Sequence, residues 1–294
     1  MALAVQDAVT ASPYDRYRPE WVPAEFSLLN MPGRDGAGNL VLATGEGEAR
    51  RVLKLYRQRR GGRGRRLWTK LSNWAFEGKR GESPSARRET ERLSLLLWRR
   101  EGFGVCALLP EQPAPPWAGD TPYLWLEYVS GRTLFDALLD AELPAARKRE
   151  AVERLARADR ARHARAFDLG EPLLVQEHAT VKHTWWADDD RLLTLDLENG
   201  YQPDYPLDDA IGQEVVGLLR SLWWFEEDED CLRPGGLPRA YVDAYEDAEQ
   251  LRRAVRGLLG GSLRWLAKRF GDRRRRARPK TAVAERLAAL LGEA

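Results

Sequence analysis

Short runs of alternating apolar and polar residues fill the first part of the chain and predict a small antiparallel sheet. Each run is bounded by Gly, Pro, Asn or Asp, the residues that favour turns. Glycine-containing turns separate the first three runs, which favours consecutive hairpins. The predicted strands lie at 25–29, 40–44, 51–56, 105–109 and 123–129.

Helical spacing of apolar residues dominates the rest of the chain. The helix at 83–101 is marked most clearly, because Ser83 can cap it, Pro84 stands in its first turn and Gly102 follows it. A short strand at 192–195 interrupts the helical part. Further helices are predicted from Thr133 and at 145–167, 209–224, 241–259, 263–270 and 280–292.

This order of elements predicts an α+β fold with two lobes. Residues 1–24 have no clear period and are expected to form an irregular N-terminal arm. Residues 25–130 form a small, β-rich N-lobe, and residues 131–294 form a larger helical C-lobe. The boundary is placed near residue 130, where a strand, a short glycine-containing connector and a helix follow one another.

Composition excludes several classes of protein. The chain has 294 residues, of which 43% are hydrophobic and 31% charged, as in ordinary globular proteins. Cys106 and Cys231 have neither metal-binding spacing nor a disulfide framework, which favours a reducing compartment. No signal peptide and no long apolar span is visible. We therefore expect a cytoplasmic protein whose contact with a membrane, if any, is peripheral at the inner face of the inner membrane.

Basic residues gather at 57–80, although the net charge is only +2. Trp and Leu residues interleave with them at roughly helical spacing. Such a segment can lie on an anionic membrane surface or bind a phosphorylated substrate. It can equally be a basic, solvated helix whose Trp residues pack on the domain. Nucleic acid is not favoured, because no recognised nucleic-acid motif accompanies the basic residues.

Four groups of residues can carry chemistry. Gly33, Gly36 and Gly38 lie in the first turn, where backbone N–H groups can approach phosphates, although an ordinary flexible hairpin uses the same residues. Lys54 lies inside the third strand. Two histidines, His178 and His183, lie in the polar segment 175–186, and the strand that follows ends at Asp196. A strand that ends in a lone Asp beside a polar loop is how kinase-like folds present a metal-binding carboxylate.

Together these segments resemble the protein-kinase-like superfamily, and within it the bacterial lipopolysaccharide core kinases that phosphorylate heptose or Kdo sugars. In that family the glutamate helix carries A-R-R-E, the metal motif reads I-D-L, and a D-L-A-G-L-x-x-S helix follows. The matching segments are Val52-Leu-Lys54, Ala86-Arg-Arg-Glu89, Leu126-Glu-Tyr-Val-Ser-Gly131, Leu195-Asp-Leu197 and Glu214-Val-Val-Gly-Leu-Leu-Arg-Ser-Leu222, the last with Glu in place of Asp.

The resemblance implies ATP and Mg²⁺ as cofactors. Lys54 would contact the α- and β-phosphates of ATP and pair with Glu89, which we place on the inward face of its helix together with Leu93, Leu96 and Leu97. Asp196 would bind Mg²⁺. The remaining implied binding residues are Gly36 and Gly38 at the phosphates, Glu127 and Val129 as backbone partners of adenine, and His183 beside the metal.

The loop 175–186 departs from the family pattern, which has H-x-D before a second His or Asn. Aligning His183 with that second position puts His178 where the catalytic Asp belongs and Gln176 where the first His belongs. A shift by one residue puts Ala179 there instead. A neutral imidazole can still accept a proton near pH 7, and Lys182 can stand against the transferred phosphoryl group. The resulting catalytic set is His178, Lys182 and His183.

Two functions follow from this sequence. The first is an ATP- and Mg²⁺-dependent phosphotransferase that acts on a hydroxyl of a glycan or lipid-linked sugar. The alternative is a catalytically impaired pseudokinase that binds nucleotide or other proteins. A zinc site is disfavoured, because His178 and His183 lack a third ligand in the sequence.

Overall fold

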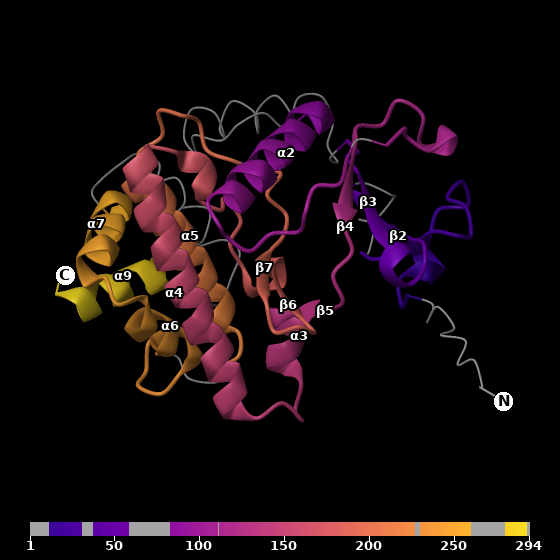
Figure 1. Ribbon diagram of the computed structural model, residues 1–294. Coiled ribbons are helices and arrows are strands. Elements are labelled where there is room, and N and C mark those ends of the chain that lie inside the picture. Colours follow the sequence, from indigo (N-terminus) through magenta and orange to yellow (C-terminus); the bar gives the residue numbers. More distant parts are fainter. Residues whose placement is uncertain are drawn as a thin grey trace.

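The computed structural model of the chain describes residues 12–30, 38–58, 83–110, 112–226, 230–259 and 280–292. Strands and helices separate into two lobes, with strands β2, β3 and β4 on one side of the molecule and helices α4, α5, α6, α7 and α9 on the other (Figure 1). Helix α2 lies between them at the top of the view. The predicted two-lobed α+β fold, with a β-rich N-lobe and a helical C-lobe, is confirmed.

The N-lobe sheet is antiparallel throughout and has the order β1-β2-β3-β4. Successive side chains of β3 point to opposite faces, as in any strand. Leu53 and Leu55 belong to a small core on the outer face, whereas Val52 and Tyr56 belong to the main core, and Lys54 is on their side. The strands are β1 (Ser27–Leu28), β2 (Leu40–Thr44), β3 (Arg51–Leu55) and β4 (Tyr123–Glu127).

Helix α2 (Pro84–Arg100) begins as predicted, with the side chain of Ser83 accepting a hydrogen bond from the N–H of Ala86. Its buried face is different from the predicted one. Leu93 and Leu96 are 37% and 45% exposed, and Glu89 lies on the outside with them. The buried side chains are Arg87, Thr90, Glu91, Ser94, Leu95 and Trp98. Most of these are polar, and of the predicted inward residues only Leu97 packs on the main core, so the predicted face is wrong for Leu93, Leu96 and Glu89.

The C-terminal end of α2 is fixed to the C-lobe by Trp98. This side chain is 1% exposed, and its indole N–H donates to the carbonyl of Leu173 at 2.8 Å. The guanidinium group of Arg162, from helix α4 (Ala145–Leu169), lies 4.4 Å from the centre of the indole ring. The N-lobe helix is therefore joined to the C-lobe core and not only to its own sheet.

A short connector joins the lobes and leads from β4 into β5 (Gly131–Thr133) and α3 (Leu134–Leu139). Strand β5 pairs with β6 (Thr184–Ala187), which pairs with β7 (Leu192–Thr194) in a second antiparallel sheet. Gly131 has φ +145, and a Cβ there would lie 2.3 Å from the carbonyl oxygen of Trp186. The strand predicted at 105–109 is wrong, since that segment forms isolated bridges through Val105 and Leu108.

Helix α5 (Leu207–Trp223) is buried along most of its length and forms the centre of the C-lobe. The predicted helix 241–259 is in fact two helices, α6 (Leu237–Tyr245) and α7 (Ala248–Leu259), because Glu246 between them has a left-handed φ of 58. The last helix is α9 (Lys280–Leu291); the prediction at 263–270 lies outside the described residues. Short 3-10 turns are η1 (Asp15–Tyr17), η3 (Gly47–Ala49), η4 (Pro116–Ala118), η5 (Pro172–Leu174) and η6 (Val181–His183).

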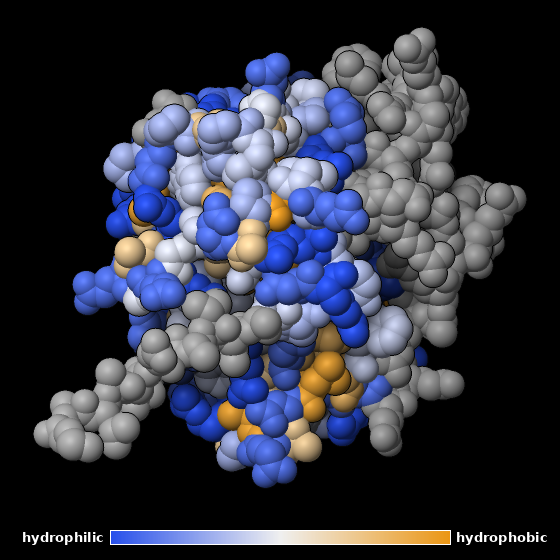
Figure 2. Space-filling model, turned by 90° about the vertical axis from the view of Figure 1, so that its right-hand side faces the viewer, coloured by the Kyte–Doolittle hydropathy of each residue, from blue (hydrophilic) through white to orange (hydrophobic). Residues whose placement is uncertain are grey.

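The surface seen from the N-lobe side is largely hydrophilic, with hydrophobic residues gathered in small areas (Figure 2). Over the residues that the structure describes, none of the helices has the length and apolar character needed to cross a membrane.

Candidate functional site

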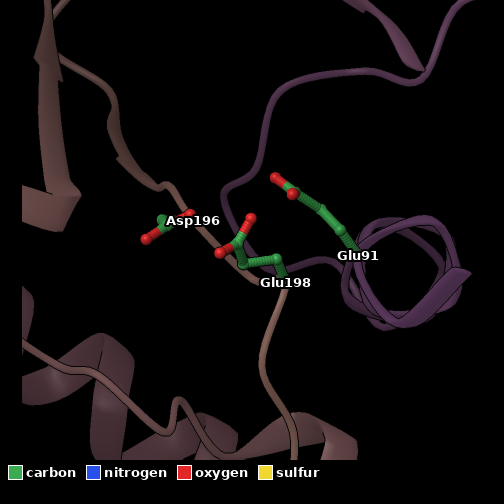
Figure 3. Close-up of side chains that lie close together, drawn as sticks. All are labelled: Glu91, Asp196 and Glu198. Carbon is green, nitrogen blue, oxygen red and sulfur yellow. The ribbon is translucent and has the colours of Figure 1, made fainter. Parts of the chain in front are cut away.

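The ammonium group of Lys54 lies at the centre of three carboxylates. Its Nζ is 2.6 Å from Glu91, 3.0 Å from Asp196 and 3.7 Å from Glu198. Figure 3 shows Glu91 on α2 and the other two on the segment after β7, with the three side chains close together. One oxygen of each carboxylate lies within 4.8 Å of the others. Strand β3, helix α2 and the segment after β7 thus meet at one point.

The backbone presents Asp196 to this point in an uncommon conformation. Its φ is 62, in the left-handed region that Asp and Asn adopt more readily than most residues. The preceding N–H, of Leu195, donates to the carbonyl of His183 at 2.7 Å. The side chain of Asp196 is 32% exposed, whereas those of Lys54 and Glu91 are 7% and 4% exposed. Asp196 is therefore the carboxylate of this group that a ligand can reach.

Burial and charge act against one another in this cluster. Burial by itself would lower the pKa of Lys54, but the charges of Glu91 and Asp196 outweigh it and hold that pKa above its usual value. Burial would raise the pKa of Asp196, but the positive charge of Lys54 holds it well below its ordinary range. Burial raises the pKa of Glu91, against the effect of Lys54 and with that of the neighbouring carboxylates. Asp196 is thus a carboxylate at neutral pH.

Glu198 is held by a second buried cation. Arg87, which is 1% exposed, donates to Glu198 at 2.9 Å and to the side-chain oxygen of Asn39 at 2.8 Å. The amide of Asn39 in turn donates to Glu198. Because Asn39 immediately precedes β2, this set ties the first hairpin to α2 and to the segment that follows Asp196.

The predicted pairing of Lys54 with Glu89 is wrong. Glu91 pairs with Lys54 and also accepts the hydroxyl hydrogen of Tyr56 at 2.6 Å. Glu89 instead lies between Arg88 and Arg92, at 3.3 Å and 2.7 Å. Residues two apart on a helix are about 200° apart around its axis, so only one of the two glutamates can face the sheet. The match to A-R-R-E therefore pointed to Glu89, which is the glutamate that faces outward.

Hydrogen bonds made by Gln176 and His183 hold the loop that carries the two histidines. The N–H of Gln176 donates to Glu214 at 2.8 Å, and its side-chain amide donates to the carbonyl of Leu195 at 2.9 Å. His183 Nδ1 lies 2.7 Å from the carbonyl oxygen of His178, and the Nε2 of the same ring lies 3.6 Å from Asp196. The structure therefore places His183 beside Asp196, and its predicted role as a metal ligand stays a prediction.

Glu214 belongs to a buried network beneath the loop. The guanidinium group of Arg162 contacts both Glu214 and Asp159, and the ring of His163 bridges Glu214 at 3.1 Å and Tyr245 at 2.7 Å. Although burial raises the pKa of Glu214, Arg162 and His163 bring it down to about 2. A charged Glu214 is thus available to hold the backbone of the loop.

His178 and Lys182 each contact a side chain outside the Lys54 cluster. The His178 ring is 52% exposed, and its Nε2 lies 3.3 Å from Glu177. The Lys182 ammonium group lies 4.4 Å from the centre of the Phe135 ring, on α3. The amino group of Lys182 thus packs on an aromatic ring, and its contact with a transferred phosphoryl group stays a prediction.

The predicted nucleotide-binding residues are only partly placed. Gly38 has φ +95, a value that favours glycine, and Gly36 lies outside the described residues. The N–H of Glu127 donates to the carbonyl of Ala107 at 2.9 Å, so this donor is used within the N-lobe. Val129 is half-buried in the connector between the lobes. An adenine contact by these residues stays a prediction.

Asp196 fits a magnesium ion better than its neighbours do. Mg²⁺ takes oxygen ligands, often one or two carboxylates together with substrate phosphates. Glu91 is occupied by Lys54 and Tyr56, and Glu198 by Arg87, so Asp196 is the carboxylate best placed to accept a metal. His183 stands beside it, but imidazole suits softer metals than Mg²⁺. The residues present fit Mg²⁺ held by Asp196, with Glu198, two residues on in the same segment, as a second carboxylate within 4.8 Å.

No protein-family model matches the chain, and no curated protein matches it. Among solved structures, it is similar to WaaP in complex with acyl carrier protein, at 16% identity and a TM-score of 0.43 over 96% of this chain and 97% of that one. It is similar to an apo pseudokinase, at 12% identity and a TM-score of 0.42 over 90% of each chain. It is also similar to a mutant PknI kinase domain from Mycobacterium tuberculosis, at 15% identity and a TM-score of 0.42 over 92% of this chain and 98% of that one.

At these identities and TM-scores, the likenesses carry no argument about activity or substrate. The protein-kinase-like fold is seen in the chain's own elements: the antiparallel N-lobe sheet, the helix whose Glu91 pairs with Lys54, the single connector and the helical lobe. The segment that ends in Asp196 follows β7 beside the histidine loop, as in that fold.

Proposed function

We propose that the protein is an ATP- and Mg²⁺-dependent phosphotransferase. One observation carries the proposal: Lys54 lies buried between Glu91 and Asp196, which come from different elements and have opposite exposure. A buried Lys held by one sheltered and one accessible carboxylate is the arrangement that positions nucleotide phosphates beside a metal in kinases. In such chemistry the protein mainly orients the reactants and neutralises their charge.

In this proposal Lys54 binds the nucleotide phosphates and Glu91 keeps its ammonium group in place. Asp196 holds Mg²⁺, which supplies charge neutralisation for the phosphates when it is bound. Gly38, at the end of the first turn, immediately precedes Asn39, whose side-chain amide donates to Glu198 of the same site. The carbonyl of Glu127, at the end of β4, and the backbone of Val129, in the connector, are offered to adenine.

In the proposed reaction His178 is the general base, which takes the proton from the substrate hydroxyl. Its exposure permits contact with a bound substrate, and its carbonyl holds His183, which lies against Asp196. The acceptor is a hydroxyl of a glycan or lipid-linked sugar. The basic stretch 57–80, most of which lies outside the described residues, is proposed to contact that substrate or an anionic membrane.

The proposal is tested by phosphoryl transfer from γ-labelled ATP to a cell-envelope glycan extract. We expect Mg²⁺-dependent label transfer by the wild type, and a loss of about a hundredfold or more in His178→Ala, the scale of general base catalysis. Arg160→Ala, an exposed change on α4, serves as the matched control and keeps wild-type transfer. Transfer by His178→Ala at the wild-type rate contradicts the assigned role of His178.

A second function, a nucleotide-binding pseudokinase, is favoured by two departures around the same site. When His183 is aligned with the second position of the family's loop, His178 takes the place of the catalytic Asp, and a third carboxylate, Glu198, lies 3.7 Å from Lys54. This alternative predicts Mg²⁺-dependent ATP binding without label transfer to any extract. It also predicts that His178→Ala leaves ATP binding unchanged.

A further inference from the structure

Arg87 and Lys54 both lie beside the carboxylate of Glu198. One oxygen of Glu198 is 2.9 Å from Arg87 Nη1, and the other is 3.7 Å from Lys54 Nζ. In Figure 3 this carboxylate lies between those of Asp196 and Glu91. Arg87, Lys54 and Glu198 are all buried. One buried carboxylate therefore has two buried cations within reach, the first at hydrogen-bonding distance and the second beyond it.

The guanidinium group of Arg87 is fixed by contacts with three other parts of the chain, of which Glu198 is one. Its Nη1 also donates to the side-chain oxygen of Asn39 at 2.8 Å, and its Nη2 donates to the carbonyl of Arg57. The amide of Asn39 donates to the same oxygen of Glu198 that lies 3.7 Å from Lys54. Both oxygens of Glu198 are thus held, one by Arg87 and one by Asn39, and Glu198 stays beyond hydrogen-bonding distance of Lys54.

The number of donors on Lys54 gives this separation a consequence. A Lys ammonium group has three N–H donors. Among the residues that the structure describes, Glu91 accepts one of them at 2.6 Å and Asp196 accepts another at 3.0 Å. If Glu198 moved to hydrogen-bonding distance, three carboxylates of the chain would take all three donors. While Arg87 holds Glu198, the third donor stays available to an oxygen of another molecule.

We propose that Arg87 is a positioning residue for nucleotide binding, because by holding Glu198 it keeps the third N–H of Lys54 available to a phosphate oxygen. Glu198 is the matching inhibitory group. Once released from Arg87, it pairs with Lys54 and excludes the phosphate, both by occupying the donor and by its like charge. This role rests on the proposed nucleotide site, and it adds to that site a residue that acts through Glu198 rather than on the phosphate itself.

The affinity for Mg²⁺–ATP, measured by isothermal titration on the full chain, tests this role in Arg87→Met. Methionine has a similar length but brings neither the charge nor the donors of arginine. We expect binding to weaken by about tenfold or more, because the released carboxylate competes with the phosphates for Lys54. Arg88→Met, at the next position of the same helix, is the matched control. It keeps wild-type affinity, since Arg88 pairs with Glu89 on the outer side of α2.

The double variant Arg87→Met with Glu198→Gln separates this role from a merely structural one. It removes the inhibitory carboxylate together with its partner, so we expect an affinity within about threefold of that of the wild type. If Arg87 only supported the fold, the loss of both partners would weaken binding at least as much as the loss of one. A double variant that binds as weakly as Arg87→Met therefore overturns the proposal.

Glu198→Gln alone supplies a test in the opposite direction, which holds even if Arg87→Met does not fold. Removing one negative charge beside Lys54 is expected to tighten Mg²⁺–ATP binding by about threefold. Unchanged or weaker binding by Glu198→Gln overturns the proposal, and so does wild-type affinity in Arg87→Met. Each of these results leaves the proposed phosphotransferase in place, whereas the absence of ATP binding by the wild type contradicts that function itself and the role of Arg87 with it.

Discussion

Replacing Glu91 by Gln, with Glu89→Gln as the matched control, tests which glutamate of α2 supports Lys54. Glu91 is 3% exposed and accepts hydrogen bonds from Lys54 and from Tyr56, both at 2.6 Å. Glu89 has a side chain that is 44% exposed and pairs with arginines at the surface. The two substitutions are the same in chemistry and two residues apart, so only their position differs.

The expected magnitudes follow from these environments. Breaking a buried ion pair typically costs about 3–5 kcal/mol when it strands a charge. Here Lys54 keeps Asp196 at 3.0 Å and Glu198 at 3.7 Å, so the loss is nearer to that of charge-assisted hydrogen bonds, about 1.5–3 kcal/mol. Glu89→Gln loses an exposed ion pair, worth about 0–1 kcal/mol.

The free energy of unfolding from urea titrations measures both effects, and the affinity for Mg²⁺–ATP is measured on the same samples. We expect Glu91→Gln to lower both the stability and the affinity, because the ammonium group of Lys54 loses its closest partner. Glu89→Gln is expected to leave the affinity unchanged. A larger loss of stability in Glu89→Gln than in Glu91→Gln would refute the orientation assigned to α2.

Three further predictions concern the parts that hold the site. Trp98→Ala removes the indole hydrogen bond to Leu173 and a fully buried ring, and we expect it to lower the free energy of unfolding by about 3–5 kcal/mol in urea titrations. Gly131→Ala places a Cβ against the carbonyl of Trp186 at a φ of +145, and thermal denaturation should show a lower melting temperature. Burial by itself would raise the pKa of Glu214, but the neighbouring arginine and histidine outweigh burial and lower that pKa to about 2. The stability that the charge of Glu214 contributes is present above its ordinary pKa near 4.5 and is lost as pH falls toward 2. The free energy of unfolding of Glu214→Gln should therefore fall less steeply between these pH values than that of the wild type.

Much of the framework follows from local sequence. The strand that carries Lys54 and the cap at Ser83 are confirmed within a residue, because turn residues and alternating side chains act over short distances. The strand before Asp196 is confirmed in the same way. The helix predicted at 209–224, which carries Glu214, is confirmed as α5, and the carboxylate of Glu214 accepts a hydrogen bond from the N–H of Gln176.

The polar interior of the site could not be read from the same patterns. Arg87 and Glu91 are buried on α2, so a search for an apolar face rotates the helix toward its exposed leucines. Glu198 and Asn39 are far apart in the chain, and only tertiary contact shows that Arg87 joins them. One signal was present in the sequence: Glu198 stands two residues after Asp196 in an expected turn, and Glu is not among the residues that dominate turns.

The central claim is that Lys54 and Asp196 form a site for nucleotide phosphates and Mg²⁺. Titration of ATP with and without Mg²⁺ into the wild type and Asp196→Asn tests it most directly, because Asn also tolerates the left-handed φ of 62 and keeps the backbone. Asp204→Asn, an exposed change, is the control. We predict Mg²⁺-dependent binding by the wild type and the control, and a loss of the Mg²⁺ dependence in Asp196→Asn. Equal Mg²⁺-dependent binding by all three proteins, or no ATP binding by the wild type, would contradict the claim.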